Sequence, residues 1–306
     1  MNSLSTPYNR SLHCFAIFTA CATLLLIVTG AMVTSNDAGL SVPDWPTSFG
    51  SLYRMPPMTG GVKFEHGHRM FAEFIGLLTI VLALWTTGAD RRPWMRKLGV
   101  AALATVIIQG ILGGATVLNG LPPWISTAHA AVGQAFFCIA VAIGLFAGRK
   151  WSGEEPKSAP DAQRPTLTSL AWLSSCAIYV QLILGGMFRH HGMNLLPHLL
   201  MAVVVTVLTL WTVTRVLSRH GEIGPLRHTA LTLLALLVTQ LALGGLAYMT
   251  RVVWNPNAER PAALLVGATV AHVAVGALVL AHAVILAIQS GRYLEPLAKT
   301  PRAIAA

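Results

Sequence analysis

Four histidines recur at the same place relative to a glycine-rich segment. They are His68, His129, His198 and His272, and each lies at or near the start of an apolar segment. The segments before the last three end in Gln-x-x-Leu-Gly-Gly, whereas the segment before the first ends in the degenerate Val28-Thr29-Gly30-Ala31. Imidazole is a good ligand for iron, copper and zinc, and paired imidazoles in a helix bundle commonly hold haem. The repeat therefore indicates duplicated helical hairpins that bind a metal or a haem.

The composition is that of an integral membrane protein, because 54% of the residues are hydrophobic and only 10% are charged. No charged residue occurs from Leu98 to Gly148. At about 20 residues per crossing, this stretch holds two spans separated by Pro122-Pro123. We predict an all-α membrane protein with eight transmembrane helices, the first of which is a retained helix and not a signal peptide. The predicted spans are 13–34, 68–88, 97–118, 124–147, 167–188, 195–217, 228–250 and 262–288.

The distribution of basic residues predicts the orientation of these spans. Of the 21 Lys and Arg residues, 15 lie at the termini and in the loops of one face. The positive-inside rule then places both termini in the cytoplasm of a cell-membrane protein. The net charge of +10 is spread over short loops, so anionic lipid is a sufficient partner and nucleic-acid binding is not expected.

In this topology all four histidines lie in the outer half of the membrane. A cytoplasmic linker, residues 151–166, separates an N-terminal half, residues 1–150, from a C-terminal half, residues 167–306. We expect two pseudo-symmetric four-helix bundles, one pairing His68 with His129 and the other pairing His198 with His272. The four cysteines fall inside predicted helices, where we expect neither a disulfide nor a metal site.

A second polar cluster is Glu65-His66-Gly67-His68-Arg69, at the outer end of the second span. Glu65 and His68 share a helical face because they are three residues apart. The carboxylate could orient the imidazole, transfer protons or stabilise positive charge. The alternative is a simple helix-start acid, which the recurrence of histidine in the other spans disfavours.

The remaining polar residues divide by their predicted side of the membrane. On the outer side, Arg69, Arg189 and Arg251 could bind haem propionates or lipid headgroups, with about equal weight. Glu73 is expected to pair with Arg69, four residues before it. Other outer histidines, His66, His190 and His191, stay undecided between contacts at the site and solvation. On the inner side, His13, His220 and His228 are expected at the interface, and His282 is expected in a helix core.

The motifs together resemble the heme A synthase family, membrane enzymes that oxidise a methyl group of heme O to a formyl group. The most specific of them is the first outer loop, Ala38-Gly39-Leu40-Ser41-Val42-Pro43-Asp44-Trp45-Pro46, followed by Glu65-x-x-His68-Arg69. A single histidine then opens each later even-numbered span. The resemblance covers nearly the whole chain.

This resemblance implies eight helices in two similar halves and an oxidoreductase that supplies heme A for terminal oxidases. It makes His198 and His272 the axial ligands of a heme B, and it places His68 and His129 around heme O with Glu65 as the catalytic acid. Heme O synthase and an electron donor or acceptor are the implied partners. The chain departs from many members in having Val42 and Ser48 where those members have a cysteine pair.

Two other functions use the same residues. A b-type cytochrome would need the histidines only to carry electrons, and would not need Glu65. A haem or metal transporter would need an inward path, which no polar residue or broken helix marks. For the synthase one difficulty stays open, because an iron held by both His68 and His129 has no free position for dioxygen. The source of the inserted oxygen is also open.

Overall fold

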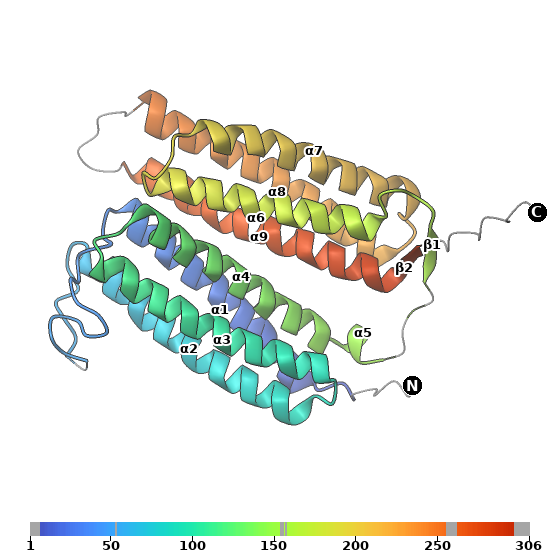
Figure 1. Ribbon diagram of the computed structural model, residues 1–306, viewed down its shortest axis with the longest axis horizontal. Helices are drawn as coiled ribbons and strands as arrows, with labels where there is room; N and C mark the ends of the chain where they lie inside the picture. The colour runs from blue at the N-terminus through green and yellow to red at the C-terminus, as the bar shows by residue number, and fades with distance from the viewer. Residues whose placement is uncertain (1–6, 53, 154–155, 157, 255–261, 297–306) are drawn as a thin grey trace, which may run out of the picture.

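The computed structural model describes residues 7–52, 54–153, 156, 158–254 and 262–296, apart from the side chains of residues 251 and 252. Eight of its helices are long and apolar enough to cross a membrane, and they run side by side (Figure 1). The described residues thus confirm the all-helical multi-pass fold. The spans are α1 (Arg10–Ser35), α2 (Val62–Ala89), α3 (Pro93–Leu118), α4 (Pro123–Ala147), α6 (Leu167–Arg189), α7 (Leu196–Arg219), α8 (Gly224–Tyr248) and α9 (Ala263–Tyr293).

Helix α2 begins six residues earlier than predicted. The chain turns at Gly60, which has a φ of +53°, and the helix then starts at Val62. Charged and histidine residues fill the first two turns, so the apolar periodicity that marks a span is hidden there. Consequently Glu65 lies in the first turn of the helix and His68 on the next.

The eight spans form two sets, α1–α4 and α6–α9 (Figure 1). Within each set every helix contacts the next, and the first also contacts the fourth, so each set is a closed ring of four. The sets meet where α1 and α4 contact α9, and where α4 contacts α6. The same pattern of helix-to-helix contacts in both sets is compatible with the predicted duplication.

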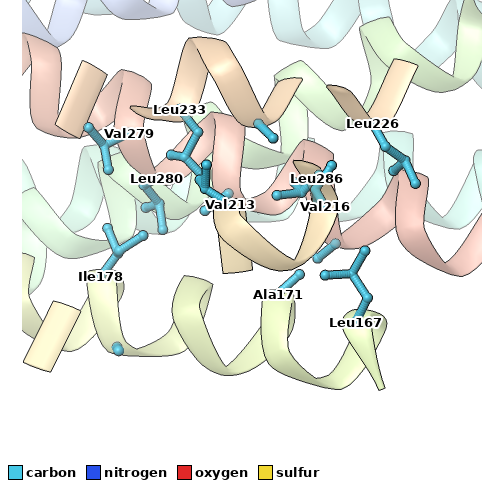
Figure 2. Close-up of a cluster of buried hydrophobic side chains, with 14 of the residues drawn as sticks. Leu167, Ala171, Ile178, Val213, Val216, Leu226, Leu233, Val279, Leu280 and Leu286 are labelled. Atoms are coloured by element: carbon cyan, nitrogen blue, oxygen red, sulfur yellow. The ribbon is translucent and has the colours of Figure 1, made fainter. Parts of the chain in front are cut away.

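Each set has its own apolar core. In α6–α9 the core includes Leu167, Val216, Leu226 and Leu286, whose side chains point between the helices (Figure 2). A small third cluster joins the two sets, with Phe137 of α4 among its members. Lipid is as apolar as a core, so close packing of the helices holds such an assembly together.

At the end of the helices where α1 begins, the linker ties the two sets together. Strand β1 (Ala159–Asp161) pairs in parallel with β2 (Leu294–Pro296), and the buried Asp161 carboxylate accepts from the backbone N–H of Leu167 at 2.6 Å. The guanidinium of Arg292 donates to the carbonyl of Lys150 and lies over the ring of Trp151, both in the short helix α5 (Arg149–Ser152). The predicted linker is therefore attached to α9 at the end of the molecule where α1 begins.

Candidate functional site

The predicted C-terminal pair of histidines is brought together from the first turn of α7 and the third turn of α9. The ring centroids of His198 and His272 are 6.4 Å apart, with an interplanar angle of 76°. An imidazole–metal bond is about 2 Å long, so two such bonds and two half-rings span about 6 Å. The two imidazoles therefore fit one iron between them. Within the described residues no cluster of three His, Cys, Asp or Glu side chains forms another kind of metal site.

The N-terminal pair is also brought together. His68 of α2 and His129 of α4 lie close enough for their charges to interact, and both are half-buried. Each set of four helices thus contributes one histidine pair.

The repeated placement of a glycine against each histidine has a direct steric cause. Each imidazole lies against Gly30 or against the first glycine of the Gly-Gly pair before it. A Cβ added at Gly113 or Gly244 would lie 3.1 Å or 3.0 Å from Cε1 of His129 or His272, closer than ordinary van der Waals contact. A Cβ added at Gly30 would lie 3.0 Å from Cε1 of His68, and one added at Gly185 would lie 2.8 Å from Cε1 of His198. Glycine therefore makes the notch in which each ring lies.

The repeated glutamine fixes which ring nitrogen carries the proton. Nδ1 of His129 lies 3.2 Å from the backbone carbonyl of Gln109, and Nδ1 of His198 lies 3.2 Å from that of Gln181. A carbonyl can only accept, so the proton is on Nδ1 and the Nε2 lone pair is available to a metal. The glutamine side-chain amides lie 3.3–3.4 Å from Nε2 of His129, His198 and His272. Among the described residues, Nδ1 of His272 has no hydrogen-bond partner.

In the first repeat a side-chain hydroxyl, and not a backbone carbonyl, is bonded to Nδ1 of the histidine. The hydroxyl of Thr29 donates to the carbonyl of Leu26 at 2.8 Å and lies 3.0 Å from Nδ1 of His68. Leu26 occupies the position of the glutamine, four residues before Gly30. A hydroxyl is thus inserted between the ring and the carbonyl that the other repeats use directly.

Glu65 and Arg69 clamp the first outer loop onto α2. The Glu65 side chain is only 4% exposed, and its Oε1 lies 2.6 Å from the Arg69 guanidinium. Its Oε2 accepts from the backbone N–H of Val42 at 2.8 Å. Arg69 also donates to the carbonyls of Val42, Asp44 and Thr47. Both side chains therefore hold the segment that contains Pro-Asp-Trp-Pro.

The predicted pair between Arg69 and Glu73 is wrong. Of the ion pairs in the described residues, the one Arg69 makes is with Glu65, and the Glu73 side chain is exposed. The loop carbonyls draw the guanidinium toward the start of the helix, away from Glu73.

Hydrogen bonds between residues of the loop also hold its conformation. The Asp44 carboxylate accepts from the Thr47 hydroxyl and from the backbone N–H groups of Phe49 and Gly50. These hydrogen bonds, led by that of Thr47, lower the pKa of Asp44 to about 2. The indole of Trp45 packs on Gly114, where a Cβ would lie 2.5 Å from the ring. In α3, therefore, the first glycine of the pair holds a histidine and the second holds the loop.

Val42 and Ser48 of the first loop are both joined to α2 through hydrogen bonds. Val42 is fully buried, and both its backbone groups are bound by Glu65 and Arg69. The Ser48 hydroxyl lies 3.0 Å from Nδ1 of His66. His66, which the sequence left undecided, therefore contacts the loop.

Arg189 connects the two sets of helices. Its guanidinium donates to the carbonyl of Ala31 at 2.8 Å and to the hydroxyl of Ser35 at 2.7 Å, both on α1. The Ser35 hydroxyl in turn lies 2.9 Å from that of Thr269 on α9. Arg189 also lies within electrostatic range of His272. Arg251 lies on the π-helix η1 (Met249–Trp254), and its side chain is outside the described residues.

The remaining outer histidines have different surroundings. Burial, the neighbouring charge of Arg189 and the proximity of His129 and His191 lower the pKa of His190 to about 4. His190, which follows α6 of the C-terminal set, therefore lies within electrostatic range of His129 of the N-terminal set. His191 is exposed, with a φ of +61°.

The histidines that the sequence predicts for the inner side have other surroundings. Nδ1 of His13 is 3.0 Å from the carbonyl of Gly144, and Nδ1 of His282 is 2.9 Å from that of Leu278 on its own helix. His228 is exposed. His220 is buried beside Asp161 and is not an interfacial side chain as expected.

Comparison with known proteins finds similarity to one group of proteins. Residues 62–196 match the family described as cytochrome oxidase assembly protein. Over 268 residues the chain is 28% identical to the heme A synthase of Symbiobacterium thermophilum, covering 78% of this chain and 85% of that protein. Shorter alignments reach 30% identity with the heme A synthases of Shouchella clausii, over 40% of each chain, and Lysinibacillus sphaericus, over 45% of each.

Proposed function

Because this chain belongs to the heme A synthase family, we propose that it binds heme O at His68 and His129 and oxidises a methyl group of heme O to the formyl group of heme A. The observation that carries the proposal is the repeated arrangement of the histidines. Both pairs have rings held in glycine notches. In three of the four rings, a carbonyl or a hydroxyl bonded to Nδ1 directs Nε2 toward a metal.

We propose that His198 and His272 are the axial ligands of a resident heme B. Their separation and their donor atoms suit a single iron. When bound, such a haem supplies one-electron transfer between an external donor or acceptor and the substrate. The protein's part is to hold the two rings, through Gly185, Gly244 and the carbonyl of Gln181.

Glu65 is proposed as the acidic residue of the oxidation. It lies one helical turn before His68, and Arg69 and the N–H of Val42 hold its carboxylate in place. A fixed negative charge beside the substrate favours positive charge that develops as the macrocycle is oxidised. The same contacts fix the loop and, through Trp45 on Gly114, attach it to α3.

The three outer arginines separate into different roles under this proposal. Arg69 is engaged by the loop, so its main part is positional. Arg189 lies beside the C-terminal pair and is the proposed contact for a heme B propionate. For Arg251 the propionate contact stays a prediction.

The proposal places residues 1–150 as the substrate half and residues 167–306 as the heme B half, with both termini in the cytoplasm. Both histidine pairs then lie toward the outer leaflet, where a substrate with an isoprenoid tail can enter from lipid. Heme O synthase is the proposed supplier of that substrate. A b-type cytochrome that only carries electrons would give no reason for the loop clamp at Glu65.

Two sets of variants test the assignment of the halves. In membranes that contain heme O, His68→Ala and His129→Ala should abolish its conversion but leave the haem held by His198 and His272. His282→Ala is the matched control, since that ring bonds its own helix, and it should convert heme O normally. Full conversion by both N-terminal variants would refute the substrate site.

A further inference from the structure

Part of the first loop exposes large apolar side chains instead of burying them. We call residues 49–58 the apolar tip. Among its described residues, the exposed apolar side chains are those of Phe49, Leu52, Met55 and Met58, which are 39–63% exposed. The sequence of the tip contains no acidic residue. A group of exposed apolar side chains of this kind marks a surface that binds a membrane or another protein.

The tip begins with a turn that is fixed by hydrogen bonds. Phe49 has a φ of +53° and Gly50 a φ of +76°, and the backbone N–H groups of both donate to the Asp44 carboxylate. Ser48 and Ser51 exchange two backbone hydrogen bonds across this turn. A positive φ is uncommon for a bulky residue such as phenylalanine. The turn therefore holds Phe49 in a strained conformation that leaves its ring exposed.

The tip lies against the start of α2. The hydroxyl of Ser48, just before the tip, lies 3.0 Å from Nδ1 of His66. At the other end of the tip, Cε of Met58 is 4.0 Å from the position of a Cβ added at Gly67. Both ends of the tip are thus next to the second turn of α2, at the end of the helices opposite the N-terminus of the chain (Figure 1).

An exposed apolar stripe runs along α2 from this point. Its side chains recur every three or four residues, so they share one face of the helix. They are those of Met70, Phe74, Leu77, Val81 and Leu84. On a helix that crosses a membrane, such a face contacts the lipid chains. Gly67 lies three residues before Met70 on the same face, so the tip continues the lipid-facing surface of α2.

The length of α2 places this part of the loop at the membrane surface. The helix has 28 residues and is therefore about 42 Å long, whereas the hydrocarbon core of a bilayer is about 30 Å thick. The first turns of α2 consequently extend into the headgroup region. Two exposed cations, Arg54 and Lys63, lie in the tip and at the start of α2, while the exposed acid of α2, Glu73, follows Lys63 by ten residues. Cations at this level suit anionic headgroups.

We propose that the apolar tip inserts into the phospholipid headgroup region and anchors the first loop to the membrane surface. Its apolar side chains reach the upper part of the acyl chains, and Arg54 and Lys63 contact the phosphates. The continuity of the tip with the lipid-facing stripe of α2 favours lipid over a second protein as the partner. The proposal does not depend on the reaction, and under the proposed topology the leaflet concerned is the outer one.

Spin-label accessibility tests this in the full-length chain, reconstituted in nanodiscs of phosphatidylethanolamine and phosphatidylglycerol. A nitroxide is attached to one added cysteine at a time, at Phe49→Cys, Leu52→Cys or Met55→Cys. Oxygen collides with labels that lie in lipid, whereas a water-soluble nickel complex collides with labels that lie in water. The native cysteines are first replaced by alanine; they are Cys14, Cys21, Cys138 and Cys176.

Two further positions calibrate the measurement. Leu77→Cys, on the stripe of α2, is the lipid reference, and Asn194→Cys, an exposed polar residue in the loop between α6 and α7, is the water reference. We expect the ratio of oxygen to nickel collisions at all three tip positions to be about threefold or more above the ratio at residue 194.

A ratio at the tip equal to that of the water reference would overturn the proposal, because the tip would then lie in water. Low accessibility of the tip to both reagents would also overturn it, because a second copy of the chain or another protein would then cover the tip.

The unaltered chain provides a second measurement that needs no substitution. A phospholipid that carries a diazirine near its headgroup is photolysed in the same nanodiscs, and its adducts are located by mass spectrometry. We expect adducts on residues 49–58 and at the start of α2, with fewer on residues 190–195. Adducts on α2 without any on the tip would contradict the insertion.

Discussion

Gly244 of α8 and His272 of α9 fit together so closely that a Cβ on the glycine would lie 3.0 Å from Cε1 of the imidazole. The next residue, Gly245, has no atom within 4 Å of the same added carbon. Of these two adjacent glycines, only Gly244 contacts a proposed haem ligand.

We expect Gly244→Ala to displace His272 and to lower haem content in the C-terminal half by about tenfold or more. Gly245→Ala should keep the haem. The measurement is the haem-to-protein ratio of each purified variant. Equal haem content in the two variants would show that the notch does not position the ligand.

The ligand assignment itself predicts a contrast between two histidines. His272→Ala should remove heme B, since one of its two axial ligands is lost. His13→Ala should leave it unchanged, because that ring bonds the carbonyl of Gly144 at the inner end of α4. Absorption spectra of the reduced, purified proteins distinguish the cases, and the reverse pattern would overturn the assignment.

Breaking the clamp between Glu65 and Arg69 should cost stability. Arg69→Met leaves the buried carboxylate without its cation and frees three loop carbonyls, so we expect a loss of about 3 kcal/mol in unfolding free energy. Adding Glu65→Gln should recover part of the loss, because the unpaired charge is removed. Denaturant unfolding in detergent measures both, and strictly additive effects of the two substitutions would contradict the coupling.

Glu65→Gln by itself separates the chemical role from the structural one. The amide keeps an acceptor for the N–H of Val42 but carries no charge. We expect haem to be retained and heme A formation to be lost. Unchanged heme A formation would remove Glu65 from the reaction and leave it as a loop anchor.

The order of the first loop should depend on pH, because the Asp44 carboxylate binds its backbone N–H groups. Its pKa in the folded chain is about 2, below the ordinary 3.8, so its contribution to loop order is complete above about pH 4 and disappears as the pH falls toward 2. Hydrogen exchange at Phe49 and Gly50 should therefore accelerate over that range beyond its intrinsic change. Asp44→Asn should abolish this pH dependence, and a loop equally protected at both ends of the range would contradict it.

Much of the fold could be predicted from the sequence, since each span is a long apolar stretch and each histidine follows a glycine segment. The eight helices follow from the apolar stretches, and the pairing of His198 with His272 follows from the predicted topology and from the linker that divides the chain. The start of α2 could not be predicted as well, because the residues that form the clamp there are polar. Strands β1 and β2 have three residues each, which is too short for any periodicity.

The site residues that sequence reasoning missed depend on contacts between distant segments. Arg69 chooses Glu65 over Glu73 because the loop carbonyls lie on one side of it, which its helix alone cannot show. Thr29 was visible only as part of a degenerate repeat, and its link to His68 required α1 and α2 to be placed together. The glutamines were a stronger signal, since they recur four residues before each notch glycine in three repeats.

The central claim is the conversion of heme O to heme A, and chromatography of haems extracted from cells that make heme O tests it most directly. The cells are compared with and without this chain. The account predicts that heme A appears only when the chain is present, and that it disappears again with His129→Ala. Unchanged heme O in cells where the chain is present, carries heme B and has a redox partner would contradict the account and favour an electron carrier.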